Sequence, residues 1–230
     1  MLENLKRDVW QANLDLVKYG LVSFTWGNVS GLEPDMGLVV IKPSGVAYGT
    51  MQPQDMVVVS LESGEVVEGS YRPSTDTPTH LELYRSLKGI RGVAHTHSLY
   101  STAFAQAGVE IPVLGTTHAD YFYGSVSCTR PLLSTEIEGD YEVETGKVIA
   151  ATMKGIDPLH MPAVLVAEHG PFIWGKSAGD AAVNAAYLEE VARLAWMTLS
   201  LEPNRSEISE ALLCKHFLRK HGTFAYYGQK

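Results

Sequence analysis

Short strand-like segments that follow one another closely are the feature that most limits the fold of this chain. Apolar and β-branched residues gather at 21–24, 38–41, 56–61 and 66–67, and only a Glu62-Ser-Gly-Glu turn separates the last two segments. Turns this short join antiparallel strands, whereas parallel strands need a crossover of about a dozen residues or more. We therefore expect an α/β domain whose sheet is mixed rather than purely parallel.

In other parts of the chain, apolar residues recur at the three- and four-residue intervals of a helix. Helices are expected at 2–19, 78–87, 98–107, 135–153, 177–200 and 206–221. Further strands are expected at 92–97, 162–167 and 172–174, and loop and strand at 108–132. No repeat, low-complexity tract or linker divides the 230 residues, so a single domain over 1–230 is the simplest interpretation.

Composition excludes several classes of protein. The formal net charge is −8 and no run of Lys or Arg is present, so we expect no nucleic-acid partner. Cys128 and Cys214 are far apart in the sequence, which argues against a disulfide framework or a thiolate zinc site. Without a signal segment or an apolar run of about 18 residues, neither export nor membrane insertion is expected. A cytoplasmic location follows as an expectation.

Three histidines stand where strands are expected to end. His95-Thr-His97 closes the segment 92–97, and residues two apart in a strand project from the same face. His169 follows the apolar run at 163–167. Three imidazoles with an open fourth position form a catalytic zinc geometry. Each histidine could instead be an ordinary hydrogen-bonded residue, but an HxH pair with a third strand-end histidine favours a metal site.

Two segments contain the parts of an anion site. Lys42-Pro-Ser-Gly45 follows a strand, and Pro73-Ser-Thr-Asp-Thr-Pro78 leads into a helix. Hydroxyls, glycine amides and a helix N-terminus are common partners of phosphate, and Lys42 adds a positive charge. Two ordinary turns with a helix cap explain the same residues equally well. Asp76 would repel a phosphate, so we expect it to face the metal or the reacting carbons.

One segment imitates a nucleotide-binding loop. Gly170-Pro-Phe-Ile-Trp-Gly-Lys-Ser177 matches the pattern GxxxxGK[ST]. A P-loop turns successive backbone amides onto phosphates, but Pro171 has no amide hydrogen and the three bulky residues after it would crowd the loop. We expect a strand, a turn and the start of a helix here instead.

Aromatic and polar residues concentrate in two further segments. They are Gly115-Thr-Thr-His-Ala-Asp-Tyr-Phe-Tyr-Gly124 and the C-terminal stretch 215–229. Chain ends usually fray, so a tail this rich in aromatic residues is expected to dock on its own subunit or on a neighbour. Ordinary core packing would also account for the aromatic residues.

Together, these motifs resemble a known family. Thr25-Trp-Gly-Asn-Val-Ser30, Ile41-Lys-Pro-Ser-Gly45, His95-Thr-His97, residues 115–124 and the ending Ala225-Tyr-Tyr-Gly-Gln are similar to those of L-ribulose-5-phosphate 4-epimerases. These enzymes belong to the class II aldolase/adducin family, and the resemblance runs over about residues 1–229. It implies a three-layer α/β/α sandwich around a mixed, largely antiparallel sheet. It also implies a homotetramer with active sites between subunits, and a role in arabinose, ascorbate or another route of pentose catabolism.

The resemblance further implies roles for single residues. Zinc, with Mn²⁺ or Co²⁺ as substitutes, would bind His95, His97 and His169. The sugar phosphate would lie against Gly27, Asn28, Lys42, Ser44, Gly45, Ser74, Thr75 and Asp76. Asp120 and a Tyr227 supplied by a neighbouring subunit would be the acid/base pair, with His216 close by. Thr75 departs from the usual serine but keeps the hydroxyl.

Inversion at C4 of a 2-ketopentose 5-phosphate restricts the mechanism. The C4 hydrogen is not adjacent to the C2 carbonyl, so simple proton abstraction would leave an unstabilised carbanion. Transient oxidation at C4 needs a nicotinamide, and no G-x-G-x-x-G fingerprint is present. Retro-aldol cleavage between C3 and C4, with the metal as Lewis acid, is the remaining route.

Two other functions stay open. A true class II sugar-phosphate aldolase would release dihydroxyacetone phosphate and an aldehyde. Asp76, where the aldolase branch carries a glutamate, and the segment around Asp120 argue against it. A catalytically silent interaction module, as in adducin, should have lost metal ligands, whereas this chain keeps all three histidines.

Overall fold

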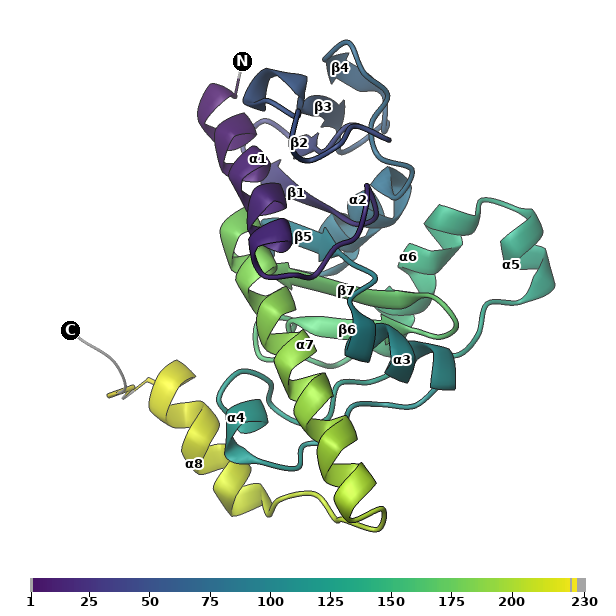
Figure 1. Ribbon diagram of the computed structural model, residues 1–230. Coiled ribbons are helices and arrows are strands. Elements are labelled where there is room, and N and C mark those ends of the chain that lie inside the picture. The colour runs from purple at the N-terminus through teal and green to yellow at the C-terminus, as the bar shows by residue number, and fades with distance from the viewer. Residues whose placement is uncertain (1, 224, 227–230) are drawn as a thin grey trace.

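Seven strands form one sheet in the computed structural model, which describes residues 2–223 and 225–226 (Figure 1). The strands are β1 (Asn28–Glu33), β2 (Leu38–Ile41), β3 (Val57–Ser60), β4 (Val66–Glu68), β5 (Gly92–His95), β6 (Ala163–Val166) and β7 (Gly170–Gly175). Their order is β4-β3-β2-β1-β5-β7-β6, and each neighbouring pair is antiparallel. A parallel contact occurs as an isolated bridge between Cys128 and Leu165. The expected largely antiparallel sheet is confirmed.

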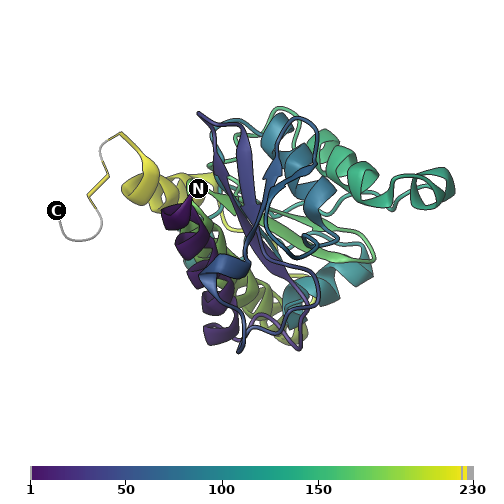
Figure 2. The ribbon, with the colours of Figure 1, turned by 90° about the horizontal axis from the view of Figure 1, so that it is seen from above.

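Helices cover both faces of this sheet. They are α1 (Glu3–Lys18), η1 (Pro53–Asp55), α2 (Thr77–Ser86), α3 (Leu99–Ala107), α4 (Thr116–Ala119), α5 (Ser134–Glu138), α6 (Tyr141–Thr152), α7 (Ala178–Leu201) and α8 (Glu210–His221). α1 and α7 pack side by side, with α3 against α7, whereas α2 and α6 pack together on the opposite face (Figures 1 and 2). The three-layer α/β/α architecture is therefore confirmed. α8 lies against α4 at one end of the molecule.

The central strand, β1, was not expected from the sequence, and neither was the short helix α4, which lies in the segment 108–132 expected to be loop and strand. The sequence of β1, Asn-Val-Ser-Gly-Leu-Glu, is poor in residues that favour strands. The strand is nevertheless buried because its two faces meet different layers. A side chain at Gly31 would collide with Leu5 and Val9 of α1, while Ser30 bonds to His80 and Tyr84 of α2. The polar Ser30 is thus accommodated by tertiary hydrogen bonds.

Two expected elements were wrong in detail. Residues 21–24 do not form a strand, because Leu21 completes the end of α1: its amide bonds to the carbonyl oxygen of Leu16, and Gly20 adopts a left-handed conformation. This arrangement is a Schellman motif, in which a buried apolar residue follows the glycine. The single helix expected at 135–153 is divided into α5 and α6 at Gly139 and Asp140. In the part of the chain that the structure describes, no helix has the length and apolar character of a membrane span.

Candidate active site

The candidate site lies where the central strands end on the α2 side of the sheet. Asn28 begins β1 and pairs with His95 at the end of β5, and His95 pairs in turn with Phe172 of β7. Directly paired residues in a sheet place their side chains on the same face. Asn28, His95 and Phe172 therefore form one row across three strands. Asp76, at the N-terminus of α2, hydrogen-bonds to Asn28 at the end of this row.

The three predicted histidines converge beside this row. Nε2 of His95 lies 3.1 Å from Nε2 of His97, and the candidate ligand atoms of His95, His97 and His169 all lie within 4.8 Å of one another. Nitrogens of two imidazoles bound to a tetrahedral zinc are about 3.3 Å apart. The fold thus brings together a donor set of the size that one divalent ion requires. His97 lies two residues beyond the end of β5, not within it.

The ring of His95 is held by the segment that imitates a P-loop. Its Nδ1 donates to the carbonyl oxygen of Pro171 at 2.9 Å, and its ring stacks on Phe172 with centroids 4.2 Å apart. A carbonyl oxygen can only accept, so the Nδ1 hydrogen is fixed and Nε2 is left with a free lone pair. As expected, this segment is a strand that leads into a helix, and it supports a histidine rather than a nucleotide.

Burial favours the neutral form of two of the three imidazoles, those of His97 and His169. Burial lowers the pKa of His97, and it lowers the pKa of His169 to about 4, with the neighbouring His95 adding to both effects. Metal ions bind the neutral form of histidine. Burial would raise the pKa of Asp76, but His95, His80 and the amide of Asn28 outweigh that effect and lower it. The donor set therefore fits a divalent cation with an ionised carboxylate nearby.

A cavity of about 310 Å³ opens beside the histidines. It is lined by Thr25, Trp26, Gly27, Asn28, Lys42, Pro43, Ser44, Gly45, Ser74, Thr75, Asp76, His95 and His97. All eight residues predicted to contact a sugar phosphate are in this list. We refer to it below as the cleft.

Lys42 is a buried cation that faces the cleft. Its side chain is 2% exposed, and within the described chain its ammonium donates one hydrogen bond, to the carbonyl oxygen of Pro43 at 3.2 Å. Burial lowers its pKa to about 8, which Asp76 partly counteracts. The ammonium also lies 4.9 Å from the ring centroid of Tyr48. A desolvated ammonium without a bonded carboxylate is a ready partner for an anion.

Backbone and side-chain groups complete an anion cradle. Within the described residues, the amides of Gly45 and Thr75 donate no hydrogen bond to the protein. The side-chain nitrogen of Asn28, Nδ2, donates to the Asp76 carboxylate at 2.5 Å and to the Ser74 hydroxyl at 3.0 Å. The side-chain oxygen of Asn28, Oδ1, is buried without a hydrogen-bond partner among the described residues. Buried polar atoms are rarely left unpaired, so this acceptor suits a hydroxyl donor on a ligand.

Two features that hold the cleft together were not predicted. The hydroxyl of Tyr48 donates to the carbonyl oxygens of Gly27 and Trp26, which fixes the turn before β1. Gly27 itself has φ +83°, and a side chain there would lie 2.8 Å from the carbonyl oxygen of His95. Tyr141 was also missed: its hydroxyl lies 3.3 Å from Nδ1 of His169. Neither tyrosine belongs to a motif that could have identified it.

Asp120 and His216 lie together but away from the cleft. Nδ1 of His216 bonds to the Asp120 carboxylate at 3.0 Å, and Arg219 donates to both of its oxygens at 2.9 Å. Burial would raise the pKa of Asp120, but these hydrogen bonds and the charge of Lys220 lower it. In the described part of the chain, no hydrogen bond, ion pair or ring contact joins Asp120 or His216 to the histidine cluster. Tyr227 lies outside the described residues.

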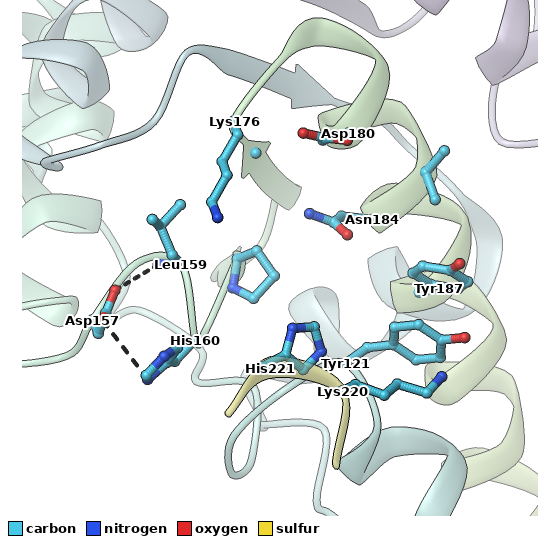
Figure 3. A pocket seen from close by; sticks show the side chains of 13 residues that line it. Tyr121, Asp157, Leu159, His160, Lys176, Asp180, Asn184, Tyr187, Lys220 and His221 are labelled. Atoms are coloured by element: carbon cyan, nitrogen blue, oxygen red, sulfur yellow. Dashed lines mark hydrogen bonds and ion pairs between the residues drawn. The ribbon is translucent and has the colours of Figure 1, made fainter. Parts of the chain in front are cut away.

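A larger cavity, of about 580 Å³, lies between the start of α7 and the end of α8. Lys176 and Asn184 point into it, while Tyr121, Lys220 and His221 line its lower side (Figure 3). Acidic residues, Asp157 and Asp180, stand among its basic ones. None of the predicted site residues that the structure describes lines this cavity, so size alone does not select the active site.

Comparison with known proteins is consistent with this geometry. The sequence model of the family named class II aldolase and adducin N-terminal domain matches residues 7–196 of this chain. The chain belongs to the class II aldolase/adducin family. Class II aldolases generally depend on a metal ion, and the three-histidine cluster is where this member can hold one. His216 and Tyr227 lie beyond the matched region.

Several solved structures share the fold. L-fuculose 1-phosphate aldolase has a TM-score of 0.77 at 23% identity, over 92% of this chain and 95% of that chain. YgbL from Klebsiella pneumoniae, whose reaction is described only as aldolase, epimerase or decarboxylase, has a TM-score of 0.72 at 28% identity, over 94% and 99%. A sugar-phosphate aldolase from Thermotoga maritima has a TM-score of 0.67 at 19% identity, over 87% and 97%.

Proposed function

We propose that this class II aldolase family member is a divalent-metal-dependent epimerase of L-ribulose 5-phosphate and D-xylulose 5-phosphate. The observation that carries the proposal is the cleft, in which the buried Lys42 and two free amides lie beside the three histidines. An anion cradle next to a metal site suits a substrate with a phosphate at one end and vicinal oxygens at the other. Aspartate at position 76, in place of glutamate, favours the epimerase over the aldolase.

The proposed reaction breaks and remakes the bond between C3 and C4. The C4 hydroxyl loses its proton, C4 becomes an aldehyde, and the bonding electrons pass to C3 to form an enediolate. A divalent ion on the imidazoles supplies Lewis-acid stabilisation of this negative charge when it is bound; zinc is the ion that a three-histidine site favours. The cradle retains glycolaldehyde phosphate while the aldehyde rotates, and addition to its other face inverts C4.

Proton transfer at the C4 oxygen requires an acid and a base. Asp120 and Tyr227 are proposed for these roles, with His216 sharing the carboxylate of Asp120. Because Asp120 contacts α8 and does not line the cleft of its own chain, we propose that a neighbouring subunit delivers it. Exposed aromatic side chains at the cleft support a subunit contact there: Trp26, which lines the cleft, is 54% exposed, and Phe24, whose ring packs against that of Trp26, is 81% exposed.

An aldolase remains the second candidate, because the solved relatives include sugar-phosphate aldolases. The two functions differ in what leaves the enzyme. An epimerase converts L-ribulose 5-phosphate into D-xylulose 5-phosphate without releasing fragments, whereas an aldolase releases an aldehyde that a coupled dehydrogenase detects. Incubation of the purified protein with L-ribulose 5-phosphate, and separately with L-fuculose 1-phosphate, distinguishes them. Release of aldehyde without formation of D-xylulose 5-phosphate would overturn the epimerase proposal.

Replacing Lys42 with methionine should weaken use of the sugar phosphate. Methionine preserves the apolar stem of the buried side chain but removes the ammonium, so the fold should persist. Loss of a charged hydrogen bond of about 2 kcal/mol corresponds to a decrease of roughly 30-fold in kcat/KM. Lys176→Met, in the larger cavity, is the matched control and should change kcat/KM less than about twofold. Equal values for wild type and Lys42→Met would remove Lys42 from the substrate site.

A further inference from the structure

The three candidate metal ligands are held by unequal means. The ring of His95 is fixed by strand pairing, by stacking on Phe172 and by the Pro171 carbonyl. His169 instead lies in the turn between β6 and β7, directly after Glu168, which has a left-handed φ of 64°. Strain of this kind persists only where surrounding contacts determine the conformation. Among the described residues, the His169 ring contacts Phe172 of its own hairpin but receives no hydrogen bond from it, so a hydrogen-bonding partner of this ring lies outside the hairpin.

Tyr141 is that partner. Its hydroxyl lies 3.3 Å from Nδ1 of His169, and this is the hydrogen bond that the described structure records for the His169 ring. The two rings lie 6.3 Å apart between centroids at an angle of 32°. The remaining ring nitrogen, Nε2, is then free for the metal. Histidine ligands commonly donate their other N–H to an oxygen, which fixes the ring and its tautomer.

Tyr141 is itself held firmly, as a positioning group must be. It occupies the first residue of α6, and the carbonyl oxygen of the next residue, Glu142, accepts a hydrogen bond from Thr79 of α2 at 2.6 Å. The carbonyl oxygen of Tyr141 accepts from Thr145 at 2.8 Å. A side chain at Gly146 would lie 2.6 Å from Cβ of Glu82, so α6 packs closely on α2. The start of α6 is thereby tied to the helix that carries Asp76.

We propose that Tyr141 is a positioning residue of the metal site: its oxygen accepts the Nδ1 hydrogen of His169 and turns Nε2 of that ring toward the ion. The inference rests on the proposed metal-dependent function. It adds to that function a contact between α6 and the third ligand, made by a residue distant from the histidine motifs in sequence. Tyr141 acts through His169 and does not need to touch the substrate.

Tyr141→Phe removes only the oxygen atom and leaves the packing of the ring. The expected result is a dissociation constant for Zn²⁺ about 10- to 100-fold higher, measured by competition with a chelator on refilled protein. The visible spectrum of the Co²⁺-substituted variant should also change, because the ligand field depends on the orientation of the imidazole. Tyr123→Phe is the matched control, since its hydroxyl contacts Cys214 instead. That variant should bind both ions as the wild type does.

A double-mutant cycle tests the route of the effect. In a His169→Ala background, Tyr141→Phe should cause no further loss of metal affinity, whereas in a His97→Ala background the full loss should remain. Unchanged affinity in Tyr141→Phe would overturn the proposal, as would an equal loss in both backgrounds. A wild-type protein that binds no divalent ion would instead contradict the proposed function itself.

Discussion

His97→Asn is expected to bind its divalent ion so much more weakly that the purified protein holds little metal, and to lower kcat/KM by about 1,000-fold or more. Charge stabilisation by a metal contributes several kcal/mol, and about 4 kcal/mol corresponds to this factor. His97 is the most exposed of the three ligands, so its replacement should not disturb the buried core. Metal content per subunit, measured by mass spectrometry of purified protein, and steady-state kinetics on L-ribulose 5-phosphate provide the two readouts.

His160→Asn is the matched control for this prediction, because His160 is exposed and lines the larger cavity. It should retain metal and activity. Exhaustive chelation of the wild type should reproduce the effect of His97→Asn, and addition of Zn²⁺, Mn²⁺ or Co²⁺ should restore activity to the wild type alone. Full activity in protein shown to be free of metal would rule out the proposed chemistry.

Residues at the ends of strands were more predictable than the strand at the centre of the sheet. The sequence alone shows a polar histidine ring at or just after the end of an apolar segment in three places, at His95, His97 and His169. β1 was missed because Asn28 and Ser30 lower its strand propensity. Their compensating partners come from α2 and the loop before it, 46 to 54 residues away. Local pattern does not contain that information.

The supporting residues of the site were unpredictable for the same reason. Tyr48 and Tyr141 act through hydrogen bonds of their hydroxyl groups to partners 21 to 28 residues away. A tyrosine in a helix or loop is more often a packing residue, so neither position has a local signal. Asp120 illustrates the opposite case. Its segment is distinctive in sequence, yet only the tertiary structure shows that it faces α8 and not the cleft.

That position of Asp120 leads to a prediction about the assembly. Asp120→Asn alone should be nearly inactive, because it removes the proposed acid/base group while leaving the metal ligands intact. In a cyclic oligomer the contact is head-to-tail, so the α8 face of one subunit can meet the cleft of the next. The aromatic side chains of Trp26, which lines that cleft, and Phe24, which packs against Trp26, are exposed and available for such a contact. Each active site would then combine His97 from one subunit with Asp120 from its neighbour.

Mixing two inactive variants tests this division directly. When His97→Asn and Asp120→Asn chains are refolded together in equal amounts, a site works only if an intact His97 meets an intact Asp120 across the contact. Each condition holds about half the time in a randomly mixed cyclic tetramer, so about a quarter of wild-type activity should return. If both residues served the same site from one chain, every site would keep one defect and no activity would return.

A second mixture, of Asp120→Asn with Tyr227→Phe, reports whether those two residues reach the site from one subunit or from two. Tagged chains purified as verified hybrids ensure that a negative result reflects the site and not failed exchange.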